Sequence, residues 1–343
     1  MDMKALNERQ IGVTFGFRAK AGYYESKKAK EEADAIAAAG IKWVTLVATV
    51  FHENYSSLVQ FIDFENSPTD LELIEMIEYF HNLGIKIQLR PMLEGLDGSD
   101  RIDTWFPHDH NERIPHCVTT HCSSWFRNMT ARSVHYAKIA ERTNCEMFCL
   151  DSEFDRITNY NEQWKGVIRA VREVYSGPVT SCHTCHTGLV DFDKAFRNKN
   201  HWFYDLDLLS MSCYQRAEDQ PGATVGEMIG YLKPMHERFV GYAKEYGKPI
   251  LLGECGCTSH TGAAMNPGGW STDPVYDGME QANYLEAIVE TFRNDDWWRG
   301  LCWWKWDEQT DRPFLAKDPA GDSGFTPKGK PAIELFRRYN KEM

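Results

Sequence analysis

The sequence predicts a (β/α)8 barrel that occupies residues 1–343 as one domain. Eight short runs rich in Val, Ile, Leu, Phe and Thr recur along the chain, and each is followed by a longer segment of helical periodicity. Several of those segments end in glycine just before the next run. Eight alternating β–α pairs predict parallel strands joined by right-handed crossovers, and a closed barrel is the simplest arrangement for that number.

The eight runs are the expected strands. They are IGVTFGF (11–17), WVTLVATVF (43–51), KIQLRPML (86–93), EMFCLDSEF (146–154), PVTSCHT (178–184), DLLSMSCY (207–214), PILLGECG (249–256) and GLCWWKW (300–306).

Amphipathic segments between these runs predict helices, for example over 25–40, 69–84 and 161–177. The first of the three contains KKAK followed by EEAD, which is typical of a solvated helix face. Thr69 and Glu72 have the spacing of a capping box. Glycine favours the left-handed backbone that closes a helix, and four glycines stand where helix-to-strand turns are expected: Gly40, Gly84, Gly177 and Gly247.

An open, doubly wound sheet is the alternative fold. It would usually place a glycine-rich phosphate loop after the first strand, and TFGFRAKAG lacks that spacing. The longest irregular stretches, 94–121 and 257–276, both follow expected strands. They therefore belong to the face where barrel active sites form.

Composition excludes several classes of function. With 42% hydrophobic and 26% charged residues the chain has the material for a large core. A net charge of −12, a pI of about 5.5 and the lack of a Lys/Arg cluster argue against a nucleic-acid partner. No apolar run is long enough to predict a membrane span. The first residues, MDMKALNERQ, lack the apolar centre of a signal peptide, so we expect reduced cysteines and a cytoplasmic location, or secretion if a leader was removed.

Glutamates stand at the ends of the fourth and seventh expected strands. Glu153 lies in LDSEF and Glu254 in LLGECG. A carboxylate in a barrel mouth must be solvated, paired or catalytic, because an isolated buried charge is costly. Strands four and seven face each other across a barrel, so both side chains are expected in one cleft. Two carboxylates about 5–5.5 Å apart suit a retaining glycosidase, in which one is the nucleophile and the other the acid/base.

The alternative is that one or both glutamates pair with arginine, and Arg90 at the end of strand three is the candidate partner. Asp151 competes with Glu153 for the role of the acid. Asp155 is a candidate for binding sugar hydroxyls.

Aromatic residues favour a sugar site, because flat rings stack on the apolar faces of sugars. In the eighth strand Trp304 and Trp306 share one face, and at least one of them is expected in the site, whereas Trp303 is expected to pack. Tyr214 ends strand six and could hydrogen-bond the nucleophile. Trp105, Trp125 and Trp270 could wall the cleft.

Two Cys/His clusters suggest other chemistry. Residues 182–186 (CHTCH) match the pattern for haem attachment, but the pattern falls on a strand end, and His183 and His186 are better interpreted as hydroxyl-binding residues. His116-Cys117 and His121-Cys122, with His108 and His110 nearby, could bind Zn²⁺, although the spacing fits no structural zinc pattern. Cys255 and Cys257 flank Glu254 without a recognisable base. We therefore expect neither a metal nor an organic cofactor.

Nearly the whole chain resembles glycoside hydrolase family 113, the β-mannanases of the large clan of retaining barrel glycosidases. The resemblance lies in GVTFGF, residues 40–57 (GIKWVTLVATVFHENYSS), TDLELIEMI with GIKIQLRPML, YSGPVT (175–180), PILLGECG, WWKWD and residues 324–332 (GFTPKGKPA). It implies that Glu254 is the nucleophile and Glu153 the acid/base. Tyr214 falls where the clan often has a tyrosine near the nucleophile. Ser152 stands where the clan usually has an asparagine that contacts the sugar 2-hydroxyl.

Three hypotheses follow. The first is a retaining endo-β-1,4-mannanase acting on mannan or manno-oligosaccharides, with Arg90, Ser152, His183, Tyr214, Trp304 and Trp306 contacting substrate. The second is a related enzyme for another β-linked substrate, such as a glucan, a xylan or an amino-sugar oligomer. The third is a sugar-binding barrel without catalysis.

Overall fold

The computed structural model describes residues 4–106, 120–308 and 322–343. Eight parallel strands form a closed ring in the order of the chain, and the last strand pairs with the first. The strands are β1 (Gln10–Phe15), β2 (Trp43–His52), β3 (Lys86–Gly95), β4 (Met147–Ser152), β5 (Val179–Thr184), β6 (Leu209–Ser212), β7 (Ile250–Cys255) and β8 (Trp298–Trp303). The predicted (β/α)8 barrel is confirmed, and the open sheet is excluded.

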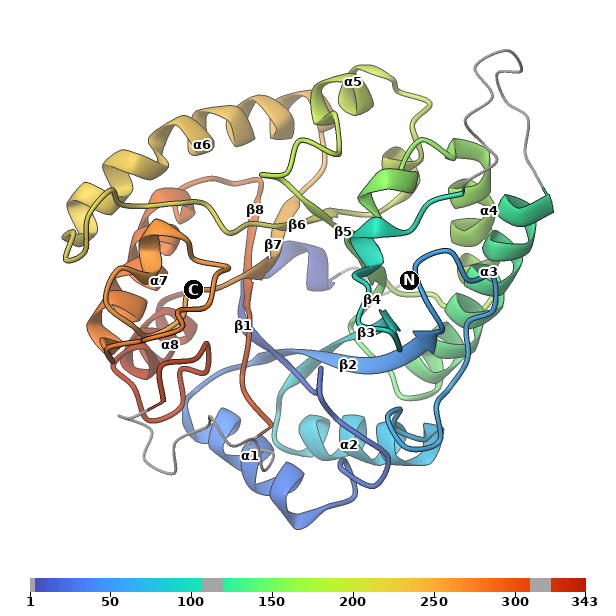
Figure 1. Cartoon of the computed structure of the whole chain (residues 1–343), viewed down its shortest axis with the longest axis horizontal. Coiled ribbons are helices and arrows are strands. Elements are labelled where there is room, and N and C mark those ends of the chain that lie inside the picture. The colour runs from blue at the N-terminus through green and yellow to red at the C-terminus, as the bar shows by residue number, and fades with distance from the viewer. Residues whose placement is uncertain (1–3, 107–119, 309–321) are drawn as a thin grey trace.

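Helices surround the ring of strands, as the view down the barrel shows (Figure 1). The α-helices are α1 (Lys27–Ala38), α2 (Asp70–Asn82), α3 (Thr120–Arg142), α4 (Asn161–Arg172), α5 (Phe192–Arg197), α6 (Val225–Tyr246), α7 (Gly278–Phe292) and α8 (Ala332–Glu342). Short 3₁₀ helices are η1 (Lys4–Asn7), η2 (Arg101–Asp103), η3 (Asp155–Ile157), η4 (Trp202–Asp205) and η5 (Ala263–Met265). Within the described ranges, no helix combines the length and apolar character that a membrane span requires.

Local signals in the sequence explain several element ends. Thr69 and Glu72 form the predicted capping box at the start of α2. Gly40, Gly84 and Gly247 adopt the left-handed backbone, with φ between 72° and 76°. Gly177 does not, and the reason for glycine there is a close approach: a Cβ would lie 2.3 Å from the hydroxyl oxygen of Tyr175.

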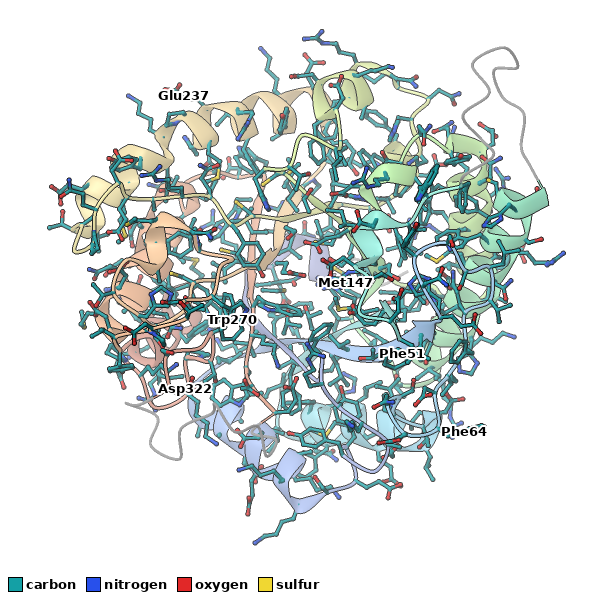
Figure 2. All side chains as sticks on the ribbon, viewed as in Figure 1. Phe51, Phe64, Met147, Glu237, Trp270 and Asp322 are labelled. Carbon is teal, nitrogen blue, oxygen red and sulfur yellow. The ribbon has the colours of Figure 1, made fainter. Side chains whose placement is uncertain are left out.

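The main core lies between the sheet and the helices, and a second, small apolar cluster fills the barrel near the amino ends of the strands. Met147, a member of that small cluster, lies near the centre of the ring (Figure 2). The barrel interior also holds polar side chains: Gln88 donates to Thr45 at 2.9 Å, and Arg90 is completely buried. Arg90 therefore lies inside the barrel and supports the groups at its mouth.

Candidate active site

A cavity of about 1070 Å³ opens at the carboxyl ends of the strands. Its wall includes Glu153, directly after β4, and Glu254, near the end of β7. Other lining side chains come from the ends of β2 and β3 and from the segments that follow β1, β3, β5, β6, β7 and β8; among them are Phe17, Glu94, Arg101, His186, Tyr214, Trp270, Trp304 and Phe325. The two glutamates thus share one cavity, and their catalytic roles stay a prediction.

Glu153 has an unusual backbone conformation. Its φ of 64° is in the left-handed region, which a residue with a side chain seldom adopts. Both carboxylate oxygens accept hydrogen bonds: Oε1 from the hydroxyl of Ser212 at 2.7 Å and Oε2 from Arg101 Nη2 at 3.0 Å. The backbone N–H of Glu153 donates to the carbonyl of Cys182 at 2.8 Å, which continues the pairing of β4 with β5. The carboxyl is therefore held from both sides at the rim of the barrel.

The Glu254 carboxyl is held by three other side chains. The hydroxyl of Tyr214 donates to Oε1 at 3.0 Å, and the Ser152 hydroxyl donates to Oε2 at 3.4 Å. Arg90 Nη1 lies 3.5 Å from the same Oε2, while Arg90 Nη2 donates to the carbonyl of Gly253 at 2.7 Å. Glycine is needed at position 253, because a Cβ there would lie only 2.6 Å from Ser210 Cβ.

Burial and the charge of Glu153 raise the pKa of Glu254 to about 7, although Arg101 and Arg90 act in the opposite direction. Burial also raises the pKa of the Tyr214 phenol well above its usual value, so this hydroxyl stays protonated and donates. The pair of carboxyls therefore retains one proton up to about neutral pH. One proton on two carboxyls is the state that an acid and a nucleophile acting together require.

Of the six side chains predicted to contact substrate, Tyr214 and Trp304 line the cavity. The Trp304 ring contacts Phe17, with 4.9 Å between ring centroids. Arg90 and Ser152 are fully buried and contact Glu254 instead. The predicted alternative for Arg90, pairing with a glutamate, is what the structure has.

The predicted substrate contacts of His183 and Trp306 are wrong. His183 is buried between Asp155 and Ser181, with hydrogen bonds of 3.0 Å on both ring nitrogens. Trp306 is buried, and its indole N–H donates to Glu32 of α1 at 2.9 Å. Strand β8 ends at Trp303, so the alternation that placed 304 and 306 on one face does not continue.

The two aspartates considered as alternative site residues do not line the cavity. Asp151 is buried against Arg132 of α3, and Asp155 accepts hydrogen bonds from His183 and Thr184, so neither lines the cavity. Trp303 packs beneath the site as predicted, with its indole N–H on the carbonyl of Phe325 at 2.9 Å.

Of the other side chains expected at the cavity, two line it and two do not. His186 and Trp270 line the cavity, and Trp270 stands edge-on to Phe325. Trp125 is completely buried among aromatic side chains, and Trp105 is not among the lining residues.

The first Cys/His cluster begins in β5, and the described residues of the second, His121 and Cys122, lie in α3. Cys182 is buried in β5, and His121 contacts the carbonyl of Ser56 at 2.9 Å. His108, His110, His116 and Cys117 lie outside the described residues. In the part of the chain that is described, no three His, Cys, Asp or Glu side chains are grouped as metal ligands, and no disulfide joins the nine cysteines there.

Three functional candidates were not predicted from sequence: Glu94, Arg101 and Ser212. Glu94 is a polar residue at a strand end and follows the same rule that identified Glu153. Arg101 lies in a long loop after β3, where sequence gives no direction for its side chain. Ser212 lies two residues before Tyr214, and both contact a glutamate of the cavity.

Comparison with known proteins agrees with this geometry. A barrel with two glutamates on the wall of one cavity, at the carboxyl ends of its strands, is the arrangement typical of retaining glycoside hydrolases. The model of Glycoside Hydrolase Family 113 matches residues 13–330, and the chain belongs to that family. No protein of curated function matches the chain significantly.

Solved structures give the same family. A GH113 β-1,4-mannanase is 27% identical, with a TM-score of 0.81 over 98% of this chain and 100% of that one. The GH113 β-mannanase from Alicyclobacillus acidocaldarius, in complex with ManMIm, is 25% identical, with a TM-score of 0.81 and 98% of each chain covered. An endo-β-1,4-mannanase from Thermotoga petrophila is 15% identical, with a TM-score of 0.59 over 98% of this chain and 77% of that one, and shares the fold.

Proposed function

We propose that this glycoside hydrolase is a retaining endo-β-1,4-mannanase that cleaves mannan or manno-oligosaccharides by double displacement. The observation that carries the proposal is the cavity with Glu153 and Glu254 on its wall, in a chain of family 113. Similar solved structures are described as β-1,4-mannanases, which supports the choice of sugar and linkage. The cavity volume, about 1070 Å³, is at the upper end of the usual range for ligand sites and supports a substrate of several sugar units.

In the first step Glu254 attacks the anomeric carbon and forms a covalent glycosyl ester, while the bond to the leaving oxygen breaks. Glu153 transfers its proton to that oxygen, so the leaving sugar departs as a neutral alcohol. The hydrogen bond from Tyr214 stabilises Glu254 as a carboxylate before the attack. The mechanism requires the one proton of the pair to be on Glu153, with Glu254 ionised, when the bond breaks.

In the second step Glu153, now ionised, takes a proton from water as the water oxygen attacks the anomeric carbon. The bond to Glu254 breaks, and the sugar leaves with its original anomeric configuration. Ser212 and Arg101 hold the Glu153 carboxyl in one place through both steps, since each occupies one of its oxygens. Trp304 and Trp270 offer flat surfaces for sugar rings on the cavity wall.

The substrate is tested with a panel of β-1,4-linked oligosaccharides and polymers of mannose, glucose, xylose and N-acetylglucosamine. We expect hydrolysis of the mannose series, with internal bonds of mannan cleaved and short oligosaccharides released early. Preferred hydrolysis of another series would reassign the sugar and leave the mechanism intact. Tight binding of all substrates without any turnover would favour a non-catalytic sugar-binding barrel.

The two carboxyl roles are tested with Glu254→Ala and Glu153→Ala on an activated aryl β-glycoside of the preferred sugar, with added azide. Each variant alone should lose more than about 1,000-fold of its kcat/KM on unactivated substrates. Azide should replace Glu254 and give the α-glycosyl azide, and it should replace the water assisted by Glu153 and give the β-glycosyl azide. Near-wild-type turnover by Glu254→Gln would disprove the mechanism.

A further inference from the structure

Arg101, in the short helix η2 that follows β3, makes an ion pair with each of two carboxylates of the cavity. Its Nη1 is paired with Glu94 and its Nη2 with Glu153, the latter at 3.0 Å. The guanidinium also donates through Nε to the carbonyl of Ser152 at 3.0 Å. With only 6% of its surface exposed, Arg101 is a buried cation inside the site, and its planar fork is fixed by three acceptors.

The Arg101 guanidinium contacts two consecutive residues, through the backbone carbonyl of Ser152 and the side chain of Glu153. Ser152 ends β4, and Glu153 turns into the left-handed region immediately afterwards. This conformation costs energy for a residue with a side chain, so surrounding contacts must maintain it. Arg101 supplies two of those contacts, one before the turn and one beyond it.

Glu94 completes the arrangement from the end of β3. Burial raises the pKa of Glu94, while the charge of Arg101 acts in the opposite direction. Burial disfavours charge on Arg101, but Glu94 and Glu153 more than offset this and raise its pKa, so the guanidinium stays charged. Glu94 thereby competes with Glu153 for the same cation.

We propose that Arg101, held by Glu94, is a positioning residue that aims the carboxyl of Glu153 and sets the pH range in which the enzyme works. The proposal rests on the proposed function, since it assigns a role relative to the acid/base. Neither residue needs to touch the reacting atoms. Both act through Glu153. Arg101 contacts the Glu153 carboxyl directly, and Glu94 weakens that interaction because it pairs with the same guanidinium.

Other charged or titratable groups also face this carboxyl. They are Glu254 on β7, Tyr214 after β6 and Cys182 on β5. Asp151 on β4 acts on Arg101 and Glu94, Arg18 after β1 acts on Glu94, and Arg90 pairs with Glu254. These groups are the same in the variants described below. A change in the pH profile therefore reports the altered member of the Arg101–Glu94 pair.

Removing the two charges should move the pH profile in opposite directions. Arg101→Met removes a cation that favours both ionised carboxyls, so both limbs of the kcat/KM profile should move to higher pH, by about one unit. Glu94→Gln removes an anion, so the positive charge of Arg101 acts more strongly on Glu153 and Glu254. Both limbs should therefore move to lower pH. A role limited to packing would not give shifts of opposite sign.

Substrates with different leaving groups distinguish the positioning role of Arg101 from the effect of its charge. Arg101→Lys keeps the cation but loses the fork, so the limbs should stay close to those of the wild type. Its kcat/KM on an oligosaccharide should fall about 10-fold or more, because proton transfer needs the aimed carboxyl. On a 2,4-dinitrophenyl β-glycoside, whose leaving group needs no proton, the fall should be under about 3-fold.

Arg156→Met is the matched control. Arg156 in η3 pairs with Asp103 of η2 at 3.1 Å, but both side chains are about half exposed and neither lines the cavity. Its activity and profile should equal those of the wild type.

The inference is overturned if both limbs stay within about 0.2 units of the wild type in Arg101→Met and Glu94→Gln, or if they move in the same direction. This result differs from failure of the proposed function. In that case the wild type would hydrolyse no β-glycoside, or Glu153→Gln would keep its activity.

Discussion

The hydroxyl of Ser212 lies 2.7 Å from Glu153 Oε1, although the backbone of Ser212 is paired in register with Glu254. One residue of β6 therefore stands between the two glutamates of the cavity. Two positions further along, Tyr214 donates to Glu254. Side chains two residues apart along this segment thus hold one carboxyl each, and the segment fixes the relative positions of the two glutamates.

Ser212→Ala should reduce kcat/KM on unactivated oligosaccharides by about 10-fold, because one hydrogen bond to a charged group contributes roughly 1.5 kcal/mol. Steady-state kinetics measure the effect. Ser210→Ala is the control, since the Ser210 hydroxyl bonds to Thr180 at 3.0 Å inside the barrel and does not line the cavity. Equal losses in the two variants would mean that the hydrogen bond to Glu153 has no special role.

Tyr214→Phe should move the acidic limb of the kcat/KM profile to higher pH by about half a unit to one unit. The reason is that the phenol donates to Glu254 and lowers its pKa, whereas burial raises it. The nucleophile must be ionised, so a higher pKa removes activity at low pH first. An acidic limb that stays in place, or that moves to lower pH, would contradict a role for this hydroxyl.

Most of the fold follows from local chemistry that the sequence displays. The strand periodicity, the capping box at Thr69 and the left-handed glycines at Gly40, Gly84 and Gly247 are all present in the structure as expected. The rule that chemistry lies at the carboxyl ends of barrel strands also placed Glu153, Glu254, Tyr214 and Trp304 on or near one cavity, as they are found. These features depend on neighbouring residues and on one topological rule.

The remaining site residues depend on tertiary direction, which alternation along a strand does not give. Asp151 and Glu153 should share a face by alternation, yet Asp151 pairs with Arg132, and Glu153, in the left-handed region, lines the cavity. Arg101 reaches Glu153 from a loop 52 residues earlier, a contact with no local signal. Residue type and spacing therefore predicted the two glutamates in one cavity, with Tyr214 and Arg90 as partners of Glu254, but not Arg101 and Ser212, which hold Glu153.

Glu254→Gln should stabilise the folded protein at pH 8 by on the order of 3 kcal/mol relative to the wild type, with much less effect near pH 4.5. The pKa of Glu254 is raised from 4.5 to about 7. Between these values the folded state holds a proton that the unfolded state releases, so wild-type stability falls as pH rises through this window. Glutamine stays neutral throughout and does not incur that loss.

Urea denaturation at pH 5 and pH 8 measures this difference. Glu237→Gln is the control, because Glu237 lies on the outer surface of α6 (Figure 2) and its removal takes the same charge from an exposed position. A Glu254→Gln effect that does not grow with pH would show that the carboxyl is not kept protonated by its surroundings.

Trp304→Ala and Trp306→Ala should have separate effects, although the residues are two apart. Trp304 lines the cavity and is partly exposed, so its loss should lower kcat/KM about 10-fold, with only a small change in stability. Trp306 is buried against Glu32, so its loss should destabilise the fold by about 3–5 kcal/mol. Assayed at a temperature where it remains folded, Trp306→Ala should keep the wild-type KM. A raised KM in Trp306→Ala with unchanged stability would place its ring in the substrate site after all.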